Sequence, residues 1–252
     1  MYIFGTFFVI FISRQKQYAD KFYTMKRIKG SLLLIVLCIS LPVSAQVMST
    51  ELQNFYDDFA SKKLMAGPKI EIYDGSPYLN DEFTSGKIIL DNGNEYNDIL
   101  LRYNIYYDQF EFNRDGEELA LEKGKYYSCF ILGEEYFFYR EFFIGNKKIE
   151  GYLKRITDGE YSLYIRYSAL LREAEKPEPY KEARKAMFIP VKPIYLIGKN
   201  DGSIYEIKNS RDFLKNFSYL EEDIRNNFDK KLKLKKEEDF VNLLNYLNGK
   251  NE

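Results

Sequence analysis

Residues 97–112, NDILLRYNIYYDQFEF, carry the pattern that decides the fold. Apolar side chains occupy every second position from Ile99 onward, and successive side chains of a strand point to opposite faces. The pattern therefore predicts a strand with one buried face. The residues that share this face are Ile99, Leu101, Tyr103, Ile105 and Tyr107.

The opposite face of the same strand carries Arg102, Asn104 and Asp108. We hypothesise that these three side chains form a polar cluster inside a curved sheet, where they hold a ligand or a loop. The alternative is a polar face that is exposed or only structural. Arg140, within the aromatic-rich strand expected over residues 136–144, is the fourth candidate binding residue.

Past Asp108 the apolar positions move by one residue, to Phe110 and Phe112. A shift of one residue exchanges the two faces of a strand. It predicts a β-bulge or a bend at Asp108 and Gln109.

The period of two extends outward from this stretch, from about residue 69 to residue 207. Turn dipeptides such as Asn92-Gly93 and Asp158-Gly159 separate the apolar runs, and they suit the positive φ values of tight hairpins. Further strands are expected over 69–73, 87–90, 126–132, 136–144, 151–156, 161–171, 188–197 and 203–207.

The segment between the last long strands differs in composition. Residues 172–185, REAEKPEPYKEARK, predict a mobile surface loop, which serves either as a lid or docking segment or as a solvated connector. Pro190 and Pro193 place the first half of the strand over 188–197 at a sheet edge.

Helical periodicity replaces the period of two after Lys208. Ser210 is expected to cap a first helix, and Ser218 with Glu221 fit a capping box for a second. A third is expected from 236 to 247, ended by Gly249. A short helix is also predicted over 49–65. We expect an α+β protein, mainly β: an antiparallel meander or curved barrel-like sheet with the helices of residues 209–247 packed on it.

Residues 25–46, MKRIKGSLLLIVLCISLPVSAQ, read as a secretory signal peptide that is cleaved after Ala45. The apolar run is shorter than the ~20 residues that cross a bilayer, so no transmembrane anchor is expected in the mature form. Residues 1–24 are interpreted as an over-extended start, with a short membrane hairpin as the alternative. Residues 46–252 are expected to form a single domain.

The composition of the chain limits the ligands and the catalytic mechanisms that can be expected. Residues 46–252 hold 31 basic and 37 acidic residues, a net charge of −6 by count, which does not favour nucleic acid. The chain contains no His, which excludes Ser-His-Asp and Cys-His catalysis and His-based zinc sites. Cys129 is expected to be a buried core residue. No catalytic residue, metal ligand or cofactor is assigned.

Two segments carry a family resemblance: Tyr78–Phe83, YLNDEF, and Leu101–Tyr106, LRYNIY, together with the Phe- and Lys-rich C-terminal helices. Over roughly residues 70–247 the chain resembles uncharacterised exported proteins of Bacteroidota-type bacteria. The resemblance implies the envelope of a Gram-negative bacterium, in the periplasm or at the cell surface. It implies no activity.

The expected function is a non-enzymatic binding or scaffold module of the cell envelope. Its partner would be an envelope protein, or an apolar or polymeric ligand held on the aromatic-rich sheet. One alternative is a periplasmic lipid or lipoprotein carrier, which requires a cavity lined by Phe and Tyr. The other is a carboxylate-based hydrolase, which requires two close acidic side chains in a cleft.

Overall fold

The computed structural model describes residues 53–56, 64–65, 73–124, 126–176, 183–228 and 232–249. Residues 1–45, with the expected signal peptide, lie outside this part of the chain, as does most of the helix predicted over 49–65. Within that prediction residues 53–56 are helical, whereas Leu64–Met65 form a strand instead.

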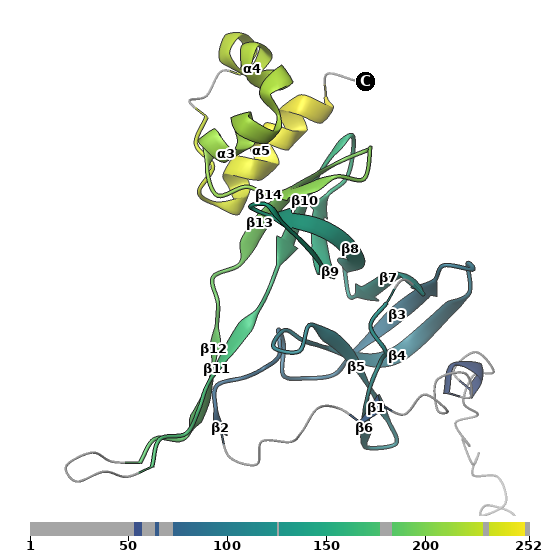
Figure 1. Cartoon of the computed structure of the whole chain (residues 1–252). Coiled ribbons are helices and arrows are strands. Elements are labelled where there is room, and N and C mark those ends of the chain that lie inside the picture. The colour runs from purple at the N-terminus through teal and green to yellow at the C-terminus, as the bar shows by residue number, and fades with distance from the viewer. Residues whose placement is uncertain are drawn as a thin grey trace, which may run out of the picture. The chain divides into compact units, whose positions relative to one another are not determined.

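The first part of the main sheet is a meander of antiparallel strands (Figure 1). From β3 to β6 each strand pairs with the next one along the chain, while β7 adds beside β3 and β1 beside β6, so that the sheet runs β1-β6-β5-β4-β3-β7. The strands are β1 (Leu64–Met65), β3 (Thr84–Leu90), β4 (Glu95–Asn104), β5 (Gln109–Arg114), β6 (Glu117–Ala120) and β7 (Tyr127–Leu132). Sequence reasoning did not find β6.

The phase shift at Asp108 is a hairpin turn, so the predicted bulge or bend was wrong. β4 ends at Asn104, whose side-chain oxygen accepts hydrogen bonds from the backbone N–H groups of Tyr106 (3.2 Å) and Tyr107 (3.0 Å). Asp108 then takes a left-handed φ of 51°, a conformation that Asp tolerates. The chain reverses, and β5 pairs with β4 in an antiparallel ladder.

The second part of the main sheet closes on itself among the described residues. Neighbouring strands follow the order β8-β14-β13-β10-β9, and β9 pairs again with β8, which makes a small barrel of five strands. The closing contact is a parallel bridge between Tyr205 and Phe143. The strands are β8 (Glu135–Ile144), β9 (Lys147–Thr157), β10 (Tyr161–Arg166), β13 (Ile194–Lys199) and β14 (Ile204–Glu206).

A separate sheet of three strands, in the order β11-β12-β2, corrects three predictions. The strand predicted over 161–171 splits into β10 and β11, and that predicted over 188–197 into β12 and β13. β12 lies in the middle of this sheet and not at its edge. Only Ala186 and Met187 of β12 pair with β2, so Pro190 lies outside that ladder. The bounds are β2 (Tyr73–Asp74), β11 (Ala169–Arg172) and β12 (Ala186–Pro190).

The segment predicted as a mobile loop is in part a hairpin. An isolated antiparallel bridge joins Glu175 to Arg184 beyond the β11–β12 ladder. Residues 177–182 lie outside the described part of the chain.

The C-terminal helices pack on the small barrel (Figure 1). They comprise α3 (Ser210–Asn216), the 3-10 turn η1 (Ser218–Leu220), α4 (Glu221–Asn227) and α5 (Glu237–Asn248). Asn209, not Ser210, caps α3, and α4 begins after η1 without the predicted capping box. The third helix is confirmed, with Phe240, Leu243, Leu244 and Leu247 buried.

The described side chains form three hydrophobic clusters. The largest fills the meander, where Phe110 stacks on Phe130 with ring centroids 4.1 Å apart and nearly parallel planes. The second joins the helices to Leu163 and Ile197 of the small barrel, and the third surrounds Phe142 and Leu153. The expected class is confirmed: mainly β, with a curved, barrel-like sheet and C-terminal helices packed on it. None of the described helices is long and apolar enough to cross a bilayer.

Candidate functional site

Two of the four candidate residues meet in a buried cluster on the meander. The Arg102 guanidinium lies between two aromatic rings, 3.6 Å from the centroid of Tyr78 and 4.1 Å from that of Phe83. The hairpin register places Arg102 directly opposite Glu111. Their ion pair is 2.7 Å long, and Asn104 donates a hydrogen bond of 2.9 Å to the same carboxylate.

This cluster is closed to solvent and neutralises its own charge. The side chains of Arg102 and Glu111 are 8% and 3% exposed. Burial lowers the pKa of the Arg102 guanidinium, but the hydrogen bond to Glu111 and the electrostatic effects of Tyr78, Glu111 and Glu118 together outweigh it, so the pKa lies above its ordinary value. Burial also raises the pKa of the Tyr78 phenol, and Glu111 adds to the effect.

The cluster holds a loop onto the sheet. Arg102 Nη1 donates to the backbone oxygen of Asp81 at 3.2 Å, and Tyr78 forms a β-bridge with Asn104. We call these five residues the arginine clamp: Tyr78, Phe83, Arg102, Asn104 and Glu111. Its geometry fits the loop-holding half of the hypothesis, since each charged group already has a partner within the protein.

Asp108 lies elsewhere, in a second polar group. Its Oδ1 accepts a hydrogen bond from the Tyr103 hydroxyl at 2.6 Å and one from the Tyr152 backbone N–H at 3.3 Å. Its Oδ2 lies 4.0 Å from Arg166 Nη2. Asp108 thus ties the β4–β5 turn to β9 and β10, and it does not share a cluster with Arg102.

Gly151 of β9 makes this approach possible. A Cβ atom at position 151 would overlap the Asp108 carboxylate. Burial raises the pKa of the Tyr103 phenol well above its ordinary value, and the Asp108 charge raises it further, so Tyr103 stays a hydrogen-bond donor.

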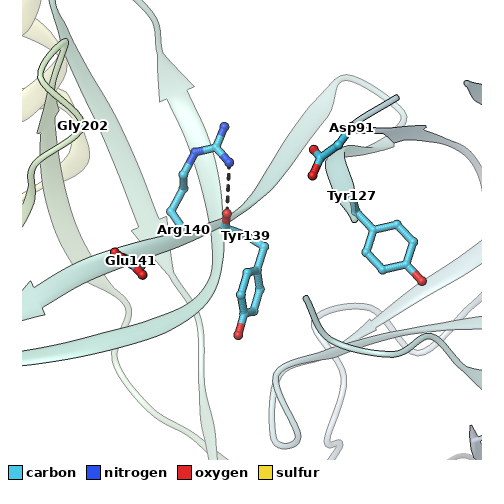
Figure 2. A pocket seen from close by; sticks show the side chains of 6 residues that line it. All are labelled: Asp91, Tyr127, Tyr139, Arg140, Glu141 and Gly202. Carbon is cyan, nitrogen blue, oxygen red and sulfur yellow. Dashed lines mark hydrogen bonds between the residues drawn. The ribbon is translucent and has the colours of Figure 1, made fainter. Parts of the chain in front are cut away.

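Arg140 lines an open pocket of about 290 Å³, shown in Figure 2. The pocket gathers residues from separate elements: β8, the β3–β4 turn, the start of β7 and the β13–β14 turn. Arg140 Nη1 donates to the Tyr139 backbone oxygen at 3.0 Å. Asp91 is exposed and accepts a hydrogen bond from Ser128 at 2.9 Å. The lining residues are Asp91, Tyr127, Tyr139, Arg140, Glu141 and Gly202.

A second surface pocket, of about 260 Å³, lies between β13, β14 and the start of α5. Its floor includes Phe240, stacked on Tyr195 with centroids 4.7 Å apart, and its rim carries Lys192, Lys208 and Lys235.

The described residues offer little for acid–base or metal chemistry. Among them, no group of three or more His, Cys, Asp or Glu side chains is placed to hold a metal ion. Glu111 and Glu118 both contact Arg102 Nη2, at 2.7 and 3.3 Å, so the two carboxylates share one cation. Cys129 is buried, and burial raises the pKa of its thiol, which disfavours the reactive thiolate.

Sequence reasoning missed the partners of Arg102. Glu111 was available as a signal, because a hairpin turn at 105–108 places position 111 opposite position 102. The interpretation of Asp108 as a bulge hid that register. Tyr78 and Phe83 gave no periodic signal, since they reach Arg102 from a loop.

Comparison of the chain with protein-family models, with curated proteins and with solved structures gives no match.

Proposed function

We propose that this protein is an exported cell-envelope protein that works as a non-enzymatic binding or scaffold module. The observation that carries the proposal is a contrast in how its polar and aromatic groups are used. Arg102 and Asn104 are buried and both bond to the Glu111 carboxylate, whereas Arg140 is exposed at an open pocket.

Aromatic packing supports external binding over the carrier alternative. A carrier needs an apolar cavity, but the Phe and Tyr rings of the meander contact one another across its interior. Tyr152 meets Phe110 edge-on at 5.0 Å and Phe130 at 5.5 Å. Rings packed at these separations fill the volume that a lipid chain would require.

The pairing of carboxylates supports binding over the hydrolase alternative. A glycosidase acid must hold a proton, which requires a carboxyl in an environment that raises its pKa. Glu111 and Glu118 instead share one arginine, Arg102. A shared cation favours a structural role for both side chains.

Crosslinking in the intact envelope tests the proposal. The full chain, tagged at its C-terminus, would carry a photo-crosslinking amino acid at Asp91 on the pocket rim. The matched control carries it at Arg211, an exposed position of α3. We expect fractionation to place the protein in the envelope, with a mass that begins at Gln46, and a crosslinked product from Asp91 alone.

Two results would contradict the proposal. The tagged protein could be found in the cytoplasm with residues 25–45 retained. Alternatively, the purified protein could carry a stoichiometric lipid in native mass spectrometry, which would favour the carrier.

A further inference from the structure

Two arginines and two aromatic rings lie against one another on the β8–β9 hairpin. Tyr136, Phe138 and Arg140 are alternate residues of β8 and so project from the same face of the strand. Arg155 lies directly opposite Tyr136 in β9. We call these four residues the arginine–aromatic stack.

The distances define a continuous row of contacts. The Arg155 guanidinium carbon is 5.9 Å from the Tyr136 ring centroid and 4.6 Å from that of Phe138. The Arg140 guanidinium carbon is 5.1 Å from the Phe138 centroid on its own strand. All three contacts lie within the range of cation–π attraction.

The stack is accessible to solvent. Tyr136 is 42% exposed, Arg140 is exposed, and the Arg155 side chain is 27% exposed. Arg155 is held by Asp158 at 3.0 Å, and Arg140 by the Tyr139 backbone oxygen at 3.0 Å. Each guanidinium is therefore partly fixed in the free protein, so binding a ligand costs less side-chain conformational entropy.

The contact with an aromatic ring also determines which guanidinium atoms are left to bind a ligand. An aromatic ring covers the flat face of a guanidinium, while the N–H donors lie at its edges. Edge donors in a fixed fork match a carboxylate or phosphate group. The exposed Tyr136 ring beside them offers a flat apolar surface.

We propose that the arginine–aromatic stack is a binding surface for an acidic polysaccharide. This inference rests on the proposed function, and it names the ligand class of the same region, since Arg140 also lines the open pocket. The carboxylates or phosphates of the polymer would pair with Arg140 and Arg155. The C–H face of a sugar ring would lie on Tyr136.

The spacing of the charges favours a polysaccharide over single-stranded nucleic acid, which also binds aromatic and basic surfaces. The two guanidiniums are separated by the uncharged Phe138 ring, and the ion pair to Asp158 reduces the local positive charge. The net charge of −6 over residues 46–252 repels a backbone with a charge on every nucleotide more strongly than a polymer whose anions are sparser. A polymer of uncharged rings with intermittent anions suits this arrangement better.

The test measures binding of the full chain to hyaluronate, in which carboxylated and uncharged sugars alternate, with dextran as the neutral polymer and oligodeoxythymidylate as the nucleic acid. We expect binding to hyaluronate, weakened about tenfold in Arg140→Ala and in Arg155→Ala by the loss of a charged hydrogen bond. Arg140→Lys keeps the charge without the fork and should give an intermediate affinity. Arg225→Ala is the matched control, because Arg225 is an exposed, ion-paired arginine on α4, and it should bind as the parent does.

Three results would overturn the inference. These are tighter binding to oligodeoxythymidylate than to hyaluronate, equal weakening by Arg225→Ala, and the absence of binding to hyaluronate. Equal melting temperatures among the variants would show that lost binding does not reflect lost folding. A crosslinked envelope protein at Asp91 with no polysaccharide binding would leave the proposed function standing and remove this inference alone.

Discussion

The arginine clamp and the arginine–aromatic stack both place an arginine against an aromatic ring, but the arginine is buried in the clamp and exposed in the stack. In the clamp, Arg102 lies between two rings and pairs with Glu111, and its side chain is 8% exposed. In the stack, Arg140 lies against one ring at 5.1 Å and is exposed to solvent. An aromatic ring beside an arginine therefore does not reveal the role of that arginine.

The difference lies in the carboxylate. A guanidinium taken out of water needs a charged partner and hydrogen bonds. Inside the clamp, Glu111 is the charged partner, and Glu118 and the Asp81 backbone oxygen accept further hydrogen bonds, although the Arg102 Nε–H donates none. These bonds make the clamp part of the fold. In the stack, water still solvates Arg140, and an external anion can replace that water.

The largest effect expected from this comparison concerns the two arginines themselves. Arg102→Ala leaves the Glu111 carboxylate buried without its cation, and breaking such a pair costs about 3–5 kcal/mol of unfolding free energy. Arg140→Ala removes an exposed side chain and should change that free energy by less than about 0.5 kcal/mol. Urea unfolding monitored by circular dichroism measures both. Similar losses from the two variants would contradict the assignment of separate roles.

A double variant sharpens the same contrast. Arg102→Met with Glu111→Leu removes both charges and keeps apolar volume but takes the acceptor from the Asn104 amide, so it should recover part of the stability lost in Arg102→Ala. If the double variant were as unstable as the single one, the ion pair would not be the source of the loss.

The next effect concerns the polar link between the meander and the small barrel. Gly151→Ala introduces a methyl group against the Asp108 carboxylate and should cost about 1–3 kcal/mol, as overpacking does. Asp108→Ala removes the obstacle, so the two substitutions together should cost less than the sum of the single losses. A double-mutant cycle by urea unfolding measures the coupling. Strict additivity would show that Asp108 and Gly151 do not interact.

Alkaline pH should lower the free energy of unfolding of the unsubstituted protein, because it ionises the buried tyrosines. Burial is the main cause that raises the phenol pKa of Tyr103, Tyr127 and Tyr152 in the folded state. A raised folded pKa means that the stabilisation is complete below the unfolded value of about 10 and is lost as the pH rises above it. Each such group should remove about 1.4 kcal/mol per pH unit in that range. Ultraviolet difference absorbance should show these phenols ionising together with unfolding. Ionisation in an intact fold would contradict their burial.

The smallest effect concerns a charge that is neither buried nor part of the stack. Asp239 accepts hydrogen bonds from the backbone N–H groups of Lys235 and Lys236 at the start of α5, and these bonds lower its pKa. A lowered folded pKa means that its contribution is present above pH ~4 and is lost as the pH falls further. Asp239→Asn should cost about 0.5 kcal/mol at pH 7 and flatten the acid limb of the stability curve. Glu238→Gln is the control, since Glu238 is an exposed neighbour in the same turn.

Much of the fold was accessible from local pattern. Alternation predicted β3, β4, β7, β8, β9 and β10, and the helical stripe predicted α5 with its inward residues. The predictions failed where one local sequence pattern is compatible with two backbone conformations. A phase shift of one residue is produced equally by a bulge and by a tight turn, and the hydrogen bonds of Asn104 decided for the turn.

The four candidate site residues show the same limit. The sequence placed Arg102 and Asn104 on one face of a strand, and the hairpin register confirms that they lie together with Glu111. It also grouped Asp108 with them, but the turn removes Asp108 from the strand and carries it to Tyr152 and Arg166. Arg140 was found only as a charge within an apolar strand, without its stacking partners.

By itself the sequence determined the mainly β class, the position of the C-terminal helices and the lack of histidine chemistry, because these follow from periodicity and composition along the chain. The tertiary structure alone decided which arginine is buried and which is open, and how β14 closes the small barrel on β8. Alternation with a period of two predicts which side chains lie on the same face of a strand. What covers that face depends on pairing between strands that lie far apart in the sequence, and no local pattern encodes that pairing.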